Sequence, residues 1–129
     1  MLETSNREAA LAGLARRLGE AWLGCSRIAE LRDTEIPADR TEAYFVADRM
    51  ARRIDDELSG WKVGATSARM RDLDGHNDVI PGRIFRSVTW EGGEVALPIE
   101  RFPDARAEAE FAFRVTADVT PAEIEDPDR

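Results

Sequence analysis

Apolar residues near the start of the chain recur every three or four positions, which is the spacing of an amphipathic helix. The sequence Ser5-Asn6-Arg7-Glu8 reads as a capping box that opens this helix, and Gly24 lies near its expected end. The stripe that this helix would bury consists of Leu11, Leu14, Ala15, Leu18, Trp22 and Cys25.

A second amphipathic pattern follows a short irregular stretch that contains Pro37. It predicts a helix with Thr41 as its N-cap that runs to about Leu58 and is broken at Gly60. The residues expected on its buried face are Ala43, Tyr44, Ala47, Met50, Ala51, Ile54 and Leu58.

After Gly60 the pattern becomes that of strands. Residues 61–66 read as a strand with a glycine inside it, and residues 67–73 suit one or two helical turns. Residues 88–90 and 94–97, joined through Glu91-Gly92-Gly93, predict a β-hairpin.

Strict alternation between apolar and polar side chains marks residues 106–115 and predicts a half-buried strand. One face would carry Ala107, Ala109, Phe111, Phe113 and Val115, and the other Glu108, Glu110, Ala112 and Arg114. Helices first and strands afterwards predict an α+β fold. We expect a helical region over residues 1–59 and strands of a sheet over residues 60–129, together forming one domain.

Composition narrows the class of protein. The 129 residues carry a formal net charge of −8, which argues against nucleic acid or an anionic membrane as a partner. A single cysteine, Cys25, excludes an internal disulfide and suits a reducing compartment. Neither a signal peptide nor an apolar run of about 20 residues is visible, so a cytoplasmic protein is expected.

Glu108 and Glu110 are the first candidates for chemistry. Two carboxylates on one face of a strand repel each other unless water or a cation lies between them. Mg²⁺ is commonly held by one or two carboxylates together with substrate oxygens. The alternative is a strand whose polar face simply lies in solvent.

Lys62 is the second candidate, because it lies in a predicted strand between Gly60 and Gly64. A glycine within a strand often marks the close approach of a ligand, and a lysine beside it can transfer protons or hold an anion. The alternative is an edge-strand lysine that discourages aggregation. Thr66 and Ser67 follow closely enough to bind a substrate carboxylate, although turn-forming hydroxyls would look the same.

The only histidine, His76, lies in a polar loop, where a solvated side chain is a simpler interpretation than a metal ligand.

Three segments in this order carry a family resemblance: residues 60–67 around Lys62, residues 81–85, and residues 107–113. Their sequences are GWKVGATS, PGRIF and AEAEFAF. Together they resemble the 2-keto-4-pentenoate hydratase branch of the fumarylacetoacetate hydrolase superfamily.

The resemblance implies a mixed β-roll decorated by helices, with Mg²⁺ or Mn²⁺ held by three carboxylates. Glu108 and Glu110 match two of these metal ligands, and Lys62 matches the catalytic lysine near the substrate. The implied partner is a small 2-oxo or 2-hydroxy dienoic acid. The full-length protein is expected to be a homo-oligomer.

The implied activity is that of a lyase that adds water to a 2-hydroxy-2,4-dienoate in the catabolism of aromatic compounds. The metal would act as a Lewis acid, and Lys62 would either move a proton or stabilise the enolate. Decarboxylation of a 2-oxo-hexenedioate and hydrolysis of an acylpyruvate are alternatives within the superfamily. A non-catalytic partner subunit is the alternative from another class.

The sequence departs from the family pattern in two ways. The third carboxylate is expected further along than Arg129, and residues 121–125 arrive too soon after Glu110 to supply it. The chain is therefore expected to be an inactive amino-terminal fragment. Ile80 stands where several hydratases and decarboxylases carry an acidic residue, with Asp78 the nearest acid, so the reaction is left open.

Overall fold

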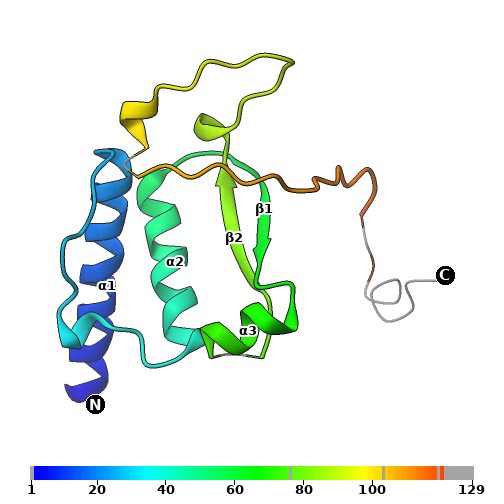
Figure 1. The fold of residues 1–129 in the computed structure, drawn as a ribbon. Helices are drawn as coiled ribbons and strands as arrows, with labels where there is room; N and C mark the ends of the chain where they lie inside the picture. The colour runs from blue at the N-terminus through cyan, green and yellow to red at the C-terminus, as the bar shows by residue number, and fades with distance from the viewer. Residues whose placement is uncertain (1, 76, 103, 119, 121–129) are drawn as a thin grey trace.

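The computed structural model describes residues 2–75, 77–102, 104–118 and 120. Helix α1 (Leu2–Leu23) lies beside α2 (Arg40–Ile54), and α2 lies between α1 and a two-stranded sheet (Figure 1). The sheet pairs β1 (Leu58–Gly64) with β2 (Ile80–Phe85), and α3 (Ala68–Asp74) connects the two strands. The predicted α+β class is confirmed at this level, whereas the complete β-roll stays a prediction.

Three short 3₁₀ turns complete the regular structure of the described residues: Asp33–Glu35, Arg86–Val88 and Ile99–Arg101. None of the helices in the described ranges combines the length and the apolar character that crossing a bilayer requires.

The hydrophobic core lies between α1 and α2. Leu11, Leu14 and Ala15 of α1 are 2–3% exposed and pack with Val46 of α2. The stripe predicted on the first helix is therefore correct over this stretch, although Trp22 at its end is 39% exposed. Partly buried side chains pack around this cluster: Leu18, Ile28 and Phe45.

The predicted ends of the helices need correction. Helix α1 begins at Leu2, so Ser5 lies within the helix rather than at its N-cap, because leucine and glutamate before Ser5 favour a helix. The N-cap of α2 is Asp39 rather than Thr41, since the Asp39 side chain accepts a hydrogen bond from the Glu42 backbone N–H at 2.9 Å.

Helix α2 also ends earlier than predicted. Asp55 takes a left-handed conformation with φ of 53°, which terminates the helix after Ile54. Leu58 and Gly60 then belong to β1, so Gly60 is not the helix break. Antiparallel pairing places Lys62 opposite Gly82 and Trp61 opposite Arg83.

The predicted hairpin over residues 88–97 is wrong. Arg86–Val88 form a 3₁₀ turn, and residues 89–98 carry no strand. Trp90 and Leu97, which a hairpin would place in one ladder, line a cavity at the end of α1 instead.

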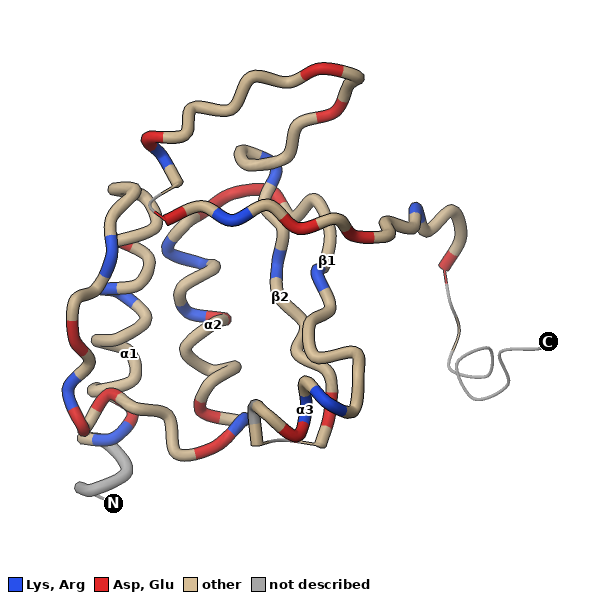
Figure 2. The backbone as a smooth tube through the Cα atoms, in the orientation of Figure 1, with Lys and Arg blue, Asp and Glu red and all other residues tan. Residues whose placement is uncertain are grey.

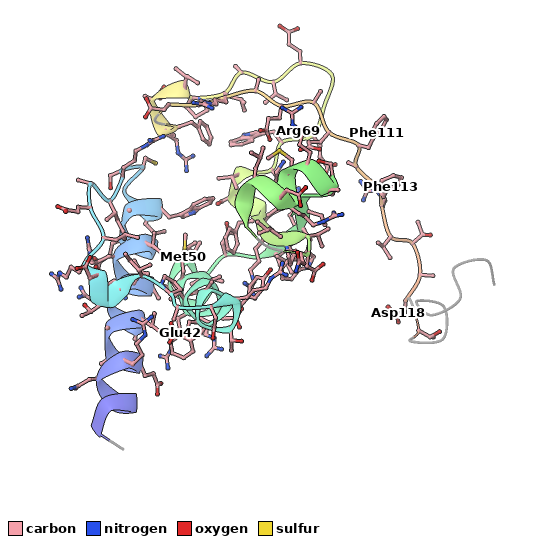
Figure 3. The ribbon with its side chains drawn as sticks, turned by 60° about the horizontal axis from the view of Figure 1, so that its bottom comes forward. Glu42, Met50, Arg69, Phe111, Phe113 and Asp118 are labelled. Atoms are coloured by element: carbon pink, nitrogen blue, oxygen red, sulfur yellow. The ribbon has the colours of Figure 1, made fainter. Side chains whose placement is uncertain are left out.

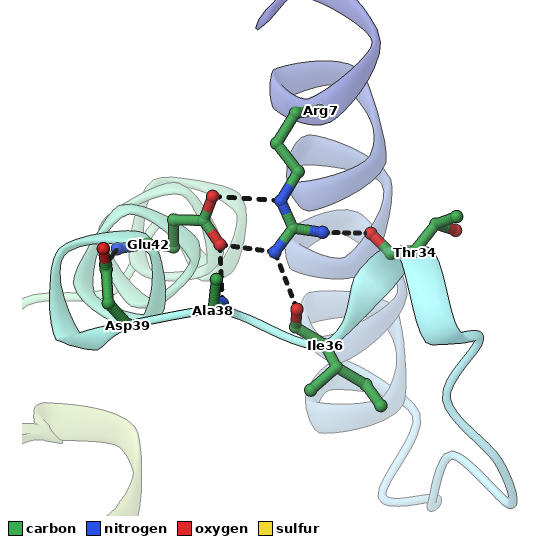
Figure 4. Close-up of polar contacts among 6 residues, drawn as sticks. All are labelled: Arg7, Thr34, Ile36, Ala38, Asp39 and Glu42. Atoms are coloured by element: carbon green, nitrogen blue, oxygen red, sulfur yellow. Dashed lines mark hydrogen bonds and ion pairs between the residues drawn. The ribbon is translucent and has the colours of Figure 1, made fainter. Parts of the chain in front are cut away.

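Arg7 of α1 contacts both the loop that precedes α2 and α2 itself (Figure 4). Its guanidinium forms a bidentate ion pair with Glu42 of α2, with Nε to Oε1 at 2.9 Å. It also donates to the Thr34 carbonyl at 2.5 Å and the Ile36 carbonyl at 2.7 Å. Because Glu42 further accepts from the Ala38 N–H at 2.7 Å, this cluster fixes how the connecting loop returns along α1 to the start of α2.

A second polar contact fixes the same loop. Glu35 is buried at 3% exposure and accepts hydrogen bonds from the Arg17 guanidinium and from the Arg32 N–H, the latter at 3.0 Å. Arg17 also donates to the Glu30 carbonyl at 2.9 Å. A buried carboxylate is tolerated here because charged and backbone donors satisfy it.

We predict that Leu14→Ala destabilises the chain by about 3 kcal/mol in urea unfolding, because it opens a cavity in the small core. The matched control is Leu23→Ala, since Leu23 is 57% exposed. That variant should change the free energy of unfolding by less than about 0.5 kcal/mol. Equal losses for the two variants would contradict the assigned core.

The Arg7–Glu42 pair predicts a pH dependence of stability. Hydrogen bonding to Arg7 lowers the pKa of Glu42 from 4.5 to about 2. The pair's contribution is therefore complete above pH 4.5 and is lost as the pH falls toward 2. At neutral pH, Glu42→Gln should lower the melting temperature in thermal unfolding. This loss should shrink as the pH falls from 4.5 toward 2. Glu94→Gln, at an exposed position, is the control. A loss of melting temperature in Glu42→Gln that does not change with pH would refute the assignment.

Candidate functional site

Lys62 projects from the face of β1 that points away from α2. Alternation along the strand places its neighbour Trp61 on the opposite face, where Trp61, Arg83 and Phe85 line a cavity of about 460 Å³ against α2. On the side of Lys62, the strand partner is Gly82, which has no side chain. A Cβ built at Gly82 would meet no atom within 4 Å, so the space beside Lys62 is open.

The extended segment that follows η3 (Ile99–Arg101) crosses this open face and brings two carboxylates to the lysine. Figure 2 shows acidic positions of the segment close to the basic position on β1. The Lys62 Nζ lies 3.1 Å from Glu108 Oε2 and 2.5 Å from Glu110 Oε1. The structure thus brings together Lys62, Glu108 and Glu110, which are separated by more than 40 positions in the sequence.

The electrostatics of this cluster decide the charge on the amine. Hydrogen bonds to Glu110 first and Glu108 second raise the pKa of Lys62 above its ordinary value. The amine is therefore an ammonium at neutral pH and acts as a proton donor or as a positive charge, not as a base. The side chain of Lys62 is half exposed and those of both glutamates are more exposed still, so the site is open to a small solute.

The segment that carries the glutamates is not the hydrogen-bonded strand that its alternation predicts. Residues 105–116 have no assigned secondary structure. Phe111 and Phe113 are 96% and 90% exposed, and Figure 3 shows Phe113 where the segment extends away from the helices. Alternation reports which side chains share a face, but a strand also requires a neighbour to complete its ladder, and no neighbouring strand pairs with it among the described residues.

Thr66 and Ser67 lie beyond the end of β1 rather than in the cluster. The Ser67 hydroxyl accepts a hydrogen bond from the Met70 N–H at 3.2 Å and caps α3. The Thr66 carbonyl accepts from the Arg71 guanidinium at 3.0 Å. Both residues therefore shape the turn into α3, and the Thr66 hydroxyl is the group that remains for a ligand.

The donor set suits a weakly held divalent cation. Glu108 and Glu110 already share one cation, the Lys62 ammonium, so a hard metal ion could take the same two carboxylates. Within the described ranges, no three Asp, Glu, His or Cys side chains gather around one point. His76 and residues 121–125, which carry the other candidate ligands, lie outside the described residues.

The choice of basic residues in the sequence is a further signal for this site. Of the 18 basic residues in the chain, Lys62 is the only lysine, and the others are arginines. Arginine stays charged in proteins, whereas the pKa of a lysine responds to its surroundings, which suits proton transfer. The one position that departs from arginine is the one that contacts both glutamates.

Comparison with known proteins agrees with the motifs. Over 113 residues the chain is 30% identical to a 2-keto-4-pentenoate hydratase of Burkholderia vietnamiensis. The match covers 85% of this chain and 43% of that protein, so the chain spans less than half the length of its relative. The resemblance to 2-keto-4-pentenoate hydratases is thereby confirmed. No protein-family model matches the chain, and no solved structure matches it significantly.

We predict that Lys62→Gln releases the glutamate-bearing segment from the sheet. Trypsin should then cut after Arg106 and Arg114 about threefold faster, because exposed ion pairs restrain the segment only modestly. Mass spectrometry of the cleavage products measures the two rates. Lys62→Arg is the control that keeps the charge, and it should cut at nearly the unsubstituted rate. Identical rates for all three proteins would remove Lys62 as the anchor.

Proposed function

We propose that the chain carries the lysine and the paired carboxylates of a metal-dependent lyase site, which adds water to a 2-hydroxy-2,4-dienoate. The observation that carries the proposal is the contact of the Lys62 ammonium with both Glu108 and Glu110. The similarity to a 2-keto-4-pentenoate hydratase supports the reaction class. A pathway for aromatic compounds is part of the same proposal.

In this proposal Glu108 and Glu110 hold Mg²⁺ or Mn²⁺. When bound, the metal would supply Lewis acidity toward the oxygens of a 2-oxo or 2-hydroxy acid. Two carboxylates leave most of the coordination sphere to water and substrate, which is how Mg²⁺ is usually held. Because the described residues offer no third carboxylate nearby, the affinity should be low.

Lys62 would bind and orient the substrate through its charge. An ammonium at this place attracts a carboxylate and stabilises negative charge that develops on a neighbouring oxygen. It can also donate its proton to a carbon of the conjugated system, returning to the charged form with a proton from water. The Thr66 hydroxyl is proposed to bind the substrate carboxylate, and Ser67 to position that residue by capping α3.

A non-catalytic partner subunit is the second candidate function. It is favoured by the exposure of Phe111 and Phe113 on a segment with no strand partner in the described part of the chain. Exposed apolar side chains in a row are typical of a surface that another polypeptide covers. Such a subunit could contribute Lys62 and the two glutamates to a site completed elsewhere.

The test of the metal site is a titration with Mn²⁺, followed by electron paramagnetic resonance. We expect weak, saturable binding to the unsubstituted chain and a loss of at least about tenfold in affinity for the Glu108→Gln, Glu110→Gln variant. The matched control is Glu94→Gln, Glu100→Gln, which removes the same charge from two exposed positions outside the cluster. That control should bind Mn²⁺ as the unsubstituted chain does.

In the same experiment, Lys62→Met shows how the lysine affects metal binding by the two glutamates. The ammonium occupies one oxygen of each glutamate, so its removal should strengthen Mn²⁺ binding a few-fold. Equal Mn²⁺ affinity in the unsubstituted chain and the double glutamate variant would refute the metal site. The partner-subunit function does not require this binding.

A further inference from the structure

A second cavity, of about 470 Å³, lies at the carboxyl-terminal end of α1. Trp22 and Cys25 form one side of it. The other side, where the chain returns past α1, is formed by Trp90, Leu97, Ile99, Arg101, Phe102, Ala105 and Arg106. An ion pair between Arg27 and Asp104, 2.9 Å long, joins the two sides at their edge.

The cavity has a wall suited to a flat apolar molecule. Trp90 and Phe102 contact each other edge to face, with ring centroids 6.0 Å apart, so their orientation is fixed. Trp22, across the cavity, is held by an edge-to-face contact with Phe85 at 5.7 Å. Cavities of roughly 300–1,000 Å³ with aromatic walls and a few polar groups are typical small-molecule sites.

Two arginines give the cavity its charge. Arg101 and Arg106 line it, and within the described ranges neither guanidinium has a hydrogen bond or an ion pair. This differs from Arg7, Arg17, Arg40 and Arg83, which each contact a carboxylate. In a chain of net charge −8, two uncompensated guanidiniums beside one apolar cavity favour an anionic ligand.

We propose that this cavity binds a flat, apolar monocarboxylic acid, with its ring or conjugated chain between Trp22 and Trp90 and its carboxylate on Arg101 and Arg106. Guanidinium groups bind carboxylates through paired, charge-assisted hydrogen bonds, which fixes the end of the ligand that faces solvent. The carboxylate of the neighbouring Asp104 is paired with Arg27, which reduces its repulsion of the ligand. The site is independent of the function proposed for Lys62.

The probe is trans-cinnamate, compared with its neutral isostere cinnamamide, and the readout is tryptophan fluorescence. Cinnamate should quench the emission saturably, with cinnamamide at least about tenfold weaker, because the amide lacks the charge that the arginines recognise. This comparison uses the unsubstituted chain and therefore depends on no variant's folding. Equal binding of the two molecules, or no saturable quenching by cinnamate, would overturn the proposal.

Variants then locate the binding. Arg101→Gln, Arg106→Gln should weaken cinnamate binding about tenfold, whereas Arg69→Gln, which removes an arginine that does not line the cavity, should leave it unchanged. Lys62→Gln loosens the segment that carries Arg106, so it should weaken cinnamate binding much less than the double arginine variant does, which separates this cavity from the Lys62 cluster. Loss of cinnamate binding in Lys62→Gln with retention in the double arginine variant would assign the ligand to the other site and refute the proposal.

Discussion

One ammonium group held between two carboxylates is the interaction on which the site depends. Lys62 extends from β1 toward a segment that begins near the end of α1, and its contacts with Glu108 and Glu110 fix where that segment crosses the sheet. The one ammonium pairs with both carboxylates but compensates only one of their two negative charges. The three side chains also make up the groups that a hard cation and an acidic substrate would use, because both carboxylates reach one point and the lysine stays charged beside it.

Polar contacts hold in place much of the structure that supports this cluster. Four well-buried apolar residues form the principal core, which is small for a chain of this length. The loop between α1 and α2 is held instead by Arg7 with Glu42 and by Arg17 with the buried Glu35. Because these contacts place α2, they also place the sheet beside it, which the Arg83–Asp48 ion pair joins to α2 (Figure 1). Lys62 projects from one face of that sheet.

The sequence predicted the parts of this arrangement that rest on local patterns. The stripe containing Leu11 and Leu14, and the alternation that separates Lys62 from Trp61, follow from helical and strand periodicity. Two features that depend on distant partners were predicted wrongly. The 88–97 hairpin fails because Trp90 packs on Phe102 instead, and residues 106–115 lack a neighbour to make them a strand. The cavity between Arg101, Arg106 and α1 has no local signal, since it forms only where the chain returns. The metal, the dienoate substrate, the assembly of further copies and the cytoplasmic location stay predictions.

Zero-length crosslinking with a carbodiimide tests the central claim most directly, because Lys62 is the only lysine in the chain. The reagent joins an amine to a carboxylate only where the two are in contact. After digestion with trypsin, the account predicts a product that links the Lys62 peptide to residues 107–114 through Glu108 or Glu110. Crosslinks from Lys62 to carboxylates elsewhere, with none to this peptide, would contradict it.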